Sequence, residues 1–236
     1  MSARMRLLLL VALLAAGPAA RAAVCEMPGA PPRATAVAIP APDKFPRVQA
    51  RIESDLRGGT PFGAVALGDS IMHGWPAGLL DRALGTRVLN AGVGGDGSGR
   101  VLWRLETLDW SRQHPKDVLI LVGTNNLKRP PCEVFWGIRA VVTRVHQMFP
   151  PARVIVTSIL PRGERLADFN AQIDAANTAL REGASSRDYI FFDAHDRLLC
   201  GHVTPCPLFQ QNLLHLTPQG YEVLTAALAD LVQRQP

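Results

Sequence analysis

Five short, mainly apolar runs recur along the chain, and polar or glycine-rich segments separate them. The runs are 64–67, 87–89, 118–122, 154–158 and 189–192. They are rich in Val, Ile, Leu and Phe, which is typical of strands in a parallel sheet that is covered on both faces. The pattern therefore predicts five parallel strands.

Segments with helical character lie between these runs. We predict helices over 75–84, 97–108, 132–148, 166–183 and 218–234, and a further helix over 46–57 packed in front. Strand and helix thus alternate five times, a pattern that favours a doubly wound α/β sandwich over separate all-α and all-β units. The predicted fold class is a three-layer α/β/α sandwich with a five-stranded parallel sheet.

The first residues differ in kind from the rest of the chain. Arg4 and Arg6 precede an apolar run over 7–16, and small residues end in an A-x-A site at 20–22. This arrangement is typical of a secretory signal peptide, here cut after Ala22. A membrane anchor is disfavoured because ten apolar residues are too few to span a bilayer. We predict a signal peptide over 1–22, an extended proline-containing leader over 23–45 and one domain over 46–236.

Removal of that segment changes the charge of the protein. The full chain of 236 residues has a formal net charge of +5, but three of its 25 basic residues lie within 1–22. The remainder carries 22 basic and 20 acidic residues, a net charge of +2. Since no basic cluster with interleaved aromatic residues remains, nucleic acid is not an expected partner. We expect an exported protein, periplasmic or extracellular, whose mature chain has no integral membrane span.

All four cysteines lie in the predicted mature chain, and an even number in an exported protein permits two disulfides in three possible pairings. Cys200 and Cys206 are close together in a loop that contains Gly and Pro, so this pair is favoured. Cys25 would then pair with Cys132 and tie the leader to the segment after residue 126. A zinc site that uses the nearby His195 and His202 is the rival hypothesis, but the spacing lacks the paired CxxC pattern of structural zinc.

Four short motifs fall where a strand or loop meets a helix. They are GDS at 68–70, NAGVGG at 90–95, GTNN at 123–126 and HLTPQGY at 215–221. In an open α/β sheet the active crevice lies outside the carboxyl ends of the strands, where we expect these motifs to lie. Alone, Ser70 could be a helix cap, Asn125 a turn residue and His215 a structural histidine. Together they supply a nucleophile, oxyanion donors and a base, which are the parts of a serine esterase.

These motifs, together with LPRG at 160–163 and LHLTPQGY at 214–221, resemble those of the SGNH hydrolases of the GDSL esterase/lipase superfamily. Within it, the chain is especially similar to the family of platelet-activating-factor acetylhydrolase catalytic subunits. The resemblance covers about residues 60 to 232. It implies a flavodoxin-like strand order 2-1-3-4-5, Ser70 as nucleophile and His215 as base. It also implies an oxyanion hole formed by the backbone N–H groups of Ser70 and Gly95 and the side chain of Asn125.

The chain departs from this family at one position, because the residue three places before His215 is Asn212 and the family has Asp there. We expect the Asn212 carbonyl to accept a hydrogen bond from His215 Nδ1–H and so set the tautomer, without the negative charge that would stabilise the imidazolium. Asp193 and Asp196 are alternative sources of an acid.

The predicted reaction is acyl transfer from an ester to Ser70 and then to water, without a metal or an organic cofactor. No lid-sized insertion separates the predicted strands, so we expect short acyl groups, acetyl above all. The partner would be a small-molecule, lipid or polysaccharide ester, and the sequence does not choose among them. A noncatalytic module that binds an acylated lipid or polysaccharide remains the alternative, as does transfer to an acceptor other than water. The sequence indicates no oligomeric state.

Overall fold

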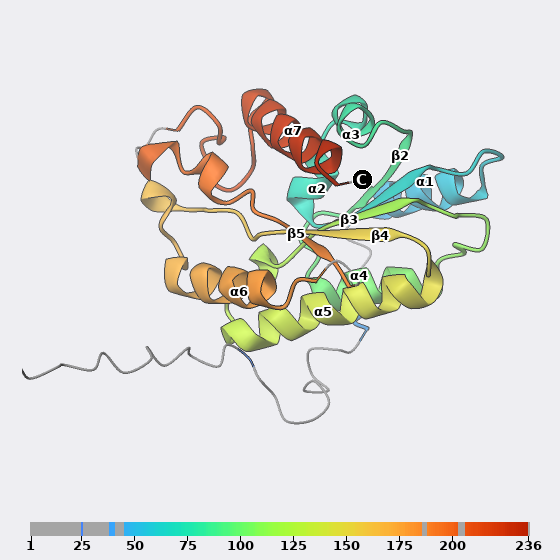
Figure 1. Ribbon diagram of the computed structural model, residues 1–236, viewed down its shortest axis with the longest axis horizontal. Coiled ribbons are helices and arrows are strands. Elements are labelled where there is room, and N and C mark those ends of the chain that lie inside the picture. The colour runs from blue at the N-terminus through green and yellow to red at the C-terminus, as the bar shows by residue number, and fades with distance from the viewer. Residues whose placement is uncertain (1–24, 26–37, 41–44, 186–187, 203–205, 236) are drawn as a thin grey trace, which may run out of the picture.

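The computed structural model describes residues 25, 38–40, 45–185, 188–202 and 206–235. At its centre is a five-stranded parallel sheet with the order β2-β1-β3-β4-β5 (Figure 1). The strands are β1 (Ala64–Gly68), β2 (Val88–Gly92), β3 (Asp117–Leu121), β4 (Arg153–Thr157) and β5 (Ile190–Phe192). This confirms the predicted fold class and the strand order implied by the family resemblance.

Helices cover both faces of the sheet, as Figure 1 shows. Side chains of α1 (Pro46–Arg57), α4 (Ser98–Thr107), α5 (Pro131–Met148) and α6 (Asn170–Glu182) pack in one apolar cluster. Those of α2 (Ser70–Gly74), α3 (Ala77–Leu84) and α7 (Pro218–Gln233) pack in the other. Short 3-10 turns lie at Thr124–Asn126, Glu164–Leu166, Asp196–Leu198 and Cys200–His202.

The strands form where the sequence can supply apolar side chains to both clusters. Along β1, Val65 and Leu67 join the cluster of α1, α4, α5 and α6, while Ala64 and Ala66 join the cluster of α2, α3 and α7. All five residues of β1 are buried. Each large aliphatic side chain that is fully removed from water contributes about 1.5–3 kcal/mol. This two-sided burial explains why the strands appear in the sequence as uninterrupted apolar runs.

The register of the sheet brings three strand ends to one edge. Gly68 at the end of β1 is paired with Gly92 of β2 and with Leu121 of β3. The chain leaves β1 for β2 on one side and later returns to β3 on the other, so the strand order reverses at β1. In such sheets the crevice at the carboxyl ends beside this reversal is the usual ligand site. The loops after β1, β2 and β3 therefore meet where function is expected.

Residues ahead of α1 contact the body of the protein at two described points. Cys25 forms a disulfide with Cys132 at the start of α5, and Ile39 N–H donates to the Gly99 carbonyl over 2.8 Å. The predicted signal peptide and most of the leader lie outside the described residues. No helix in the described part of the chain is long and apolar enough to cross a membrane.

The helix predicted over 166–183 begins later, at Asn170. Arg165, Leu166 and Phe169 all have positive φ, between 52° and 62°. Three non-glycine residues in this region of φ interrupt the regular helical path, so the segment before Asn170 forms a 3-10 turn and a loop.

Candidate active site

Ser70 lies at the first position of α2, immediately after the end of β1. The Asp69 carboxyl accepts a hydrogen bond from Ile71 N–H over 2.9 Å and so caps this short helix. Gly68 is required for the close approach of β1 to β3, because a Cβ there would lie 2.2 Å from the Leu121 carbonyl oxygen. The tight turn holds the Ser70 side chain at the edge of the sheet, as the sequence predicted.

His215 lies against Ser70, with 2.8 Å between its Nε2 and the serine Oγ. The loop that carries it is fixed on both sides. Gln210 N–H donates to the His215 carbonyl over 2.8 Å, and the Thr217 hydroxyl accepts from Gly220 N–H to cap α7. Two residues that are 145 positions apart in the sequence are therefore brought into direct contact.

Asn212 also contacts His215, but through its amide nitrogen. Its Oδ1 accepts two backbone hydrogen bonds, from Leu214 N–H at 3.1 Å and from His215 N–H at 3.0 Å. Because both of these groups are donors, the atom that faces them must be the carbonyl oxygen. The Nδ2 group is then left 2.9 Å from His215 Nδ1.

This contact reverses the expectation from the sequence. An amide NH2 can only donate, so Nδ1 must accept and the imidazole proton must sit on Nε2. In that tautomer the histidine donates to Ser70 and does not accept from it. The expected Asn212 carbonyl contact is absent because the local backbone already occupies that oxygen, in an arrangement typical of Asx turns.

The two alternative acids have other partners. Asp193 forms an ion pair with Arg181, and the Asp196 carboxylate lies 3.0 Å from His195 Nδ1. Throughout the described residues, no carboxylate oxygen lies within 4.0 Å of a His215 nitrogen. The hypothesis that either aspartate replaces the missing acid therefore has no support in the contacts of His215.

The loop after β2 carries Gly95, whose φ of 73° favours glycine. Its carbonyl accepts from the Arg100 guanidinium over 2.9 Å. The next carbonyl, that of Asp96, accepts from Asn125 Nδ2 over 2.9 Å. One Asn125 amide hydrogen is thus used to join the loops after β2 and β3, and the second remains for a ligand.

A buried ion pair supports this loop and was missed by the sequence analysis. The Asp96 carboxylate lies 2.8 Å from Arg104 Nε, and both side chains are at most 5% exposed. Arg104 also contacts the Gln49 side chain of α1. The sequence offered only a weak signal for this pair, a charge of each sign eight positions apart, because Arg100 lies between them as a competing cation.

Burial changes the electrostatics beside Ser70. Complete burial raises the pKa of the Asp69 carboxyl to about 7, and its Oδ2 has no hydrogen-bond partner. Burial also lowers the pKa of His215, and the positive charge of Arg162 lowers it further. A histidine with a lowered pKa is neutral at pH 7, which is the charge state that a general base needs.

Four cysteines form two disulfides, Cys25–Cys132 and Cys200–Cys206, the pairings favoured from the sequence. The second disulfide uses both thiols of the rival zinc hypothesis. Among the described residues there is no group of three His, Cys, Asp or Glu side chains arranged to hold a metal ion.

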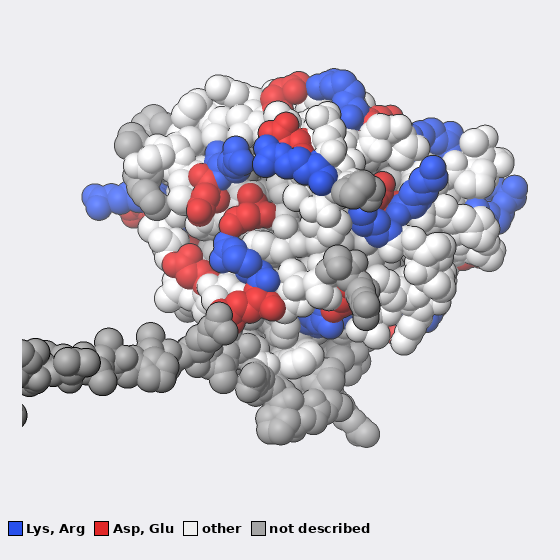
Figure 2. All heavy atoms as spheres, viewed as in Figure 1, with Lys and Arg blue, Asp and Glu red and all other residues white. Residues whose placement is uncertain are grey.

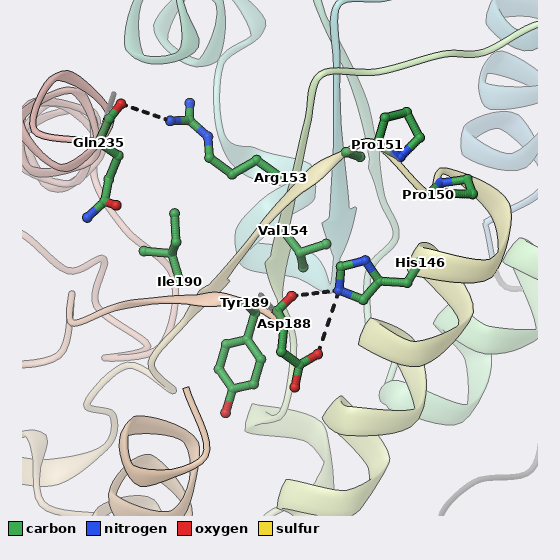
Figure 3. Close-up of a pocket in the computed structure, with 10 residues that line it drawn as sticks. His146, Pro150, Pro151, Arg153, Val154, Asp188, Tyr189, Ile190 and Gln235 are labelled. Carbon is green, nitrogen blue, oxygen red and sulfur yellow. Dashed lines mark hydrogen bonds and ion pairs between the residues drawn. The ribbon is translucent and has the colours of Figure 1, made fainter. Parts of the chain in front are cut away.

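A hollow of about 500 Å³ lies at the opposite edge of the sheet, where β4 and β5 begin (Figure 3). His146 of α5 points into it, and its Nε2 lies 2.6 Å from the Asp188 carbonyl oxygen. Arg153 and Gln235 lie on its other side. None of the residues predicted to be catalytic lines this hollow.

Comparison with known proteins finds similar sequences. Residues 66–223 match the sequence model of the GDSL-like lipase/acylhydrolase family. The human platelet-activating factor acetylhydrolase IB subunit alpha1 is 36% identical over 149 residues, which cover 62% of this chain and 64% of the human protein. The rat alpha2 subunit is 32% identical over 149 residues, with the same coverage. The chain therefore aligns with less than two thirds of the length of each of these relatives.

Solved structures share the fold. A GDSL-like lipase from Bacteroides thetaiotaomicron has a TM-score of 0.58 at 19% identity, over 82% of this chain and 98% of that one. An acetylxylan esterase from Geobacillus stearothermophilus has a TM-score of 0.59 at 17% identity, over 75% of this chain and 96% of that one.

Proposed function

Since the chain belongs to the GDSL-like lipase/acylhydrolase family, we propose that it is a secreted serine esterase that hydrolyses short-chain acyl esters, acetyl esters above all. The observation that carries this proposal is the 2.8 Å contact between Ser70 Oγ and His215 Nε2. It pairs a hydroxyl nucleophile with an imidazole base at the edge of the sheet where this class of fold binds ligands.

In the proposed reaction, His215 Nε2 takes the Ser70 proton while Oγ attacks the ester carbonyl carbon. The carbonyl π electrons move to oxygen, and this oxyanion accepts hydrogen bonds from Ser70 N–H, Gly95 N–H and Asn125 Nδ2. When the C–O bond to the alcohol breaks, the alcohol leaves with the proton from His215. Water then repeats the sequence on the acyl-serine and releases the acid. No step calls for a metal or a redox cofactor.

The contact of Asn212 predicts that this reaction is slow. His215 must first move its proton from Nε2 to Nδ1, and Nδ1–H would then face an amide N–H group. Each oxyanion donor still contributes about 2.7–4 kcal/mol to the stability of the transition state. We therefore propose a weak but measurable esterase.

The names of two similar proteins support the proposed preference for short acyl groups. The human protein is an acetylhydrolase subunit, and the Geobacillus protein is an acetylxylan esterase. A clear preference of this protein for long-chain esters would contradict this part of the proposal.

Export is supported by the two disulfides, which persist in oxidising compartments. The proposed cleavage after Ala22 predicts a mature protein that begins at Ala23. Mass spectrometry of the exported protein tests this, and an intact Met1 in the mature product would contradict it.

A second function is favoured by the same amide contact. If Asn212 keeps His215 in the Nε2–H tautomer whenever an ester is bound, the protein would be a noncatalytic module that binds an acylated lipid or polysaccharide. Fluorophosphonate labelling separates the two functions, because it needs an activated serine. We expect phosphonylation at Ser70 in the wild type and none in Ser70→Ala. No label on folded wild-type protein would favour the binding module.

A further inference from the structure

Arg162, in the LPRG segment after β4, lies between two loops of the candidate active site. Its Nη1 donates to the Thr124 hydroxyl over 2.9 Å and to the Thr124 carbonyl over 3.3 Å. Thr124 directly precedes Asn125. The next residue along, Gly163, donates its N–H to the Leu213 carbonyl over 2.7 Å, within the loop that carries His215. Arg162 is therefore held beside both the oxyanion donor and the base.

Arg162 forms no direct ion pair with an acid in the described part of the chain. No Asp or Glu oxygen there lies within 4.0 Å of its guanidinium, and its buried Nε has no hydrogen-bond partner. Two other arginines of the fold have an acid: Arg104 pairs with Asp96, and Arg139 pairs with Asp188. A half-buried guanidinium without an acid is costly unless a ligand supplies one.

The geometry of the contacts restricts what that ligand could be. Thr124 occupies Nη1, and the ring of Phe169 lies 5.6 Å from the guanidinium carbon. Because Nε is buried, Nη2 of the planar fork is the nitrogen left to donate to a carboxylate or a phosphate. The same charge adds to the burial that lowers the pKa of His215 and offsets part of the burial that raises the pKa of Asp69, as expected for a cation close to the nucleophile and the base.

We infer that Arg162 binds an anionic group of the substrate, a carboxylate or a phosphate, so that the preferred substrate is a short-chain ester carrying a negative charge near the scissile bond. This inference rests on the proposed function. It assigns a role in recognition to the LPRG segment, which the hydrolytic mechanism does not use.

Matched pairs of esters test the inference. 4-Acetoxybenzoate and its methyl ester differ in one negative charge on the alcohol side. Mono-4-nitrophenyl succinate and 4-nitrophenyl butyrate differ in the same way on the acyl side. For the pair whose charge reaches Arg162, we expect the wild type to favour the anion about tenfold or more in kcat/KM, mainly through KM.

The decisive quantity is the ratio of kcat/KM for the anionic and the neutral ester. Arg162→Gln should bring this ratio close to one, and Arg162→Lys should restore part of it, because Lys keeps the charge but loses the fork. Changes in the His215 pKa affect both esters alike and cancel in the ratio. Arg165→Gln removes an exposed charge three residues away and should leave the ratio unchanged. A ratio that is close to one in the wild type for both pairs, or that survives Arg162→Gln, overturns the inference.

A binding measurement separates this inference from the proposed hydrolysis. Calorimetry on Ser70→Ala protein should show about tenfold tighter binding of the anionic ester in one pair, and Arg162→Gln in the same background should remove the difference. If the wild type hydrolyses none of the four esters but this difference holds, the proposed hydrolysis fails and the anion site stands. Equal binding of the anionic and neutral esters in both pairs overturns the anion site.

Discussion

Asn212 presents a donor to His215 Nδ1, where a carboxylate would present an acceptor. The two backbone N–H groups that hold its carbonyl fix this orientation, so the side chain cannot turn over without losing both bonds. Both hydrogen bonds are exposed to solvent, so their loss costs at most roughly 1–3 kcal/mol. The imidazole tautomer is therefore set by the path of the backbone over 212–215 as well as by the missing charge.

Asn212→Asp should reverse the tautomer of His215. One carboxylate oxygen can keep the two backbone N–H bonds while the other accepts from Nδ1–H, which frees Nε2 to accept from Ser70. Nitrogen-15 NMR of the labelled imidazole checks this. We expect the proton on Nε2 in the wild type and on Nδ1 in Asn212→Asp.

The matched control for this NMR measurement is Gln211→Glu. It adds the same charge one residue away at an exposed position, and should leave the wild-type tautomer unchanged. A wild-type spectrum with the proton already on Nδ1 would contradict the reading of the amide contact.

The pH dependence of activity should show the lowered pKa of His215. Burial and then the charge of Arg162 disfavour the imidazolium, so the base stays neutral below its ordinary pKa of 6.5. The acid limb of kcat/KM should therefore lie below pH 6.5. Arg162→Gln removes one of the two causes of the lowered His215 pKa and should therefore move the acid limb to higher pH. Asn212→Asp should move the acid limb to still higher pH, because a carboxylate stabilises the imidazolium. If the acid limb lies at the same pH in Arg162→Gln as in the wild type, Arg162 is not close enough to His215 to affect its pKa, which would contradict the structure.

At the scale of the elements, the sequence was sufficient where burial determines structure. Five apolar runs predicted five strands because each strand is covered on both faces. The sequence did not reveal α2, since its five residues are too few for helical periodicity. It placed Ser70 and His215 at the edge of the sheet, but the strand order was implied only by the family resemblance. The orientation of the Asn212 amide depends on backbone hydrogen bonds over three residues, which no residue pattern specifies.

The buried Asp96–Arg104 pair joins the loop after β2 to α4, and its loss should be costly. Arg104→Met leaves the Asp96 carboxylate buried without a partner, which typically destabilises a protein by about 3–5 kcal/mol. Urea unfolding measures this free energy. Arg82→Ala breaks an exposed ion pair with Glu222 and should change the free energy of unfolding by about 1 kcal/mol at most.

The double variant Asp96→Asn/Arg104→Met tests why Arg104→Met loses stability. It removes both charges and should recover part of the stability, because no uncompensated charge stays buried. If Arg104→Met and Arg82→Ala lower the free energy of unfolding equally, the buried pair does not support the fold.

At the scale of the whole molecule, two covalent links differ greatly in the length of chain that they close. Cys25–Cys132 joins residues 107 positions apart, and Cys200–Cys206 joins residues six apart. In the chain-entropy account, a loop of about 100 residues contributes up to about 4.7 kcal/mol, and a short loop contributes less. Cys25→Ser/Cys132→Ser should therefore lower Tm more than Cys200→Ser/Cys206→Ser. Thermal unfolding followed by circular dichroism measures both, and the opposite order would contradict this account.

The molecule also presents both signs of charge on the face seen in Figure 2, with Lys and Arg interspersed among Asp and Glu. This distribution agrees with the near-neutral charge of the predicted mature chain. On this face, the described residues do not form the single-sign surface by which proteins attract nucleic acids.

The most direct test of the central claim is hydrolysis of p-nitrophenyl acetate by the disulfide-bonded protein, measured for the wild type, Ser70→Ala and Asn212→Asp. We predict a slow wild-type rate that Ser70→Ala abolishes and that Asn212→Asp raises by as much as about 10⁴. Hydrolysis that persists in Ser70→Ala, or silence of all three folded proteins, would contradict the account of a serine esterase restrained by the Asn212 amide.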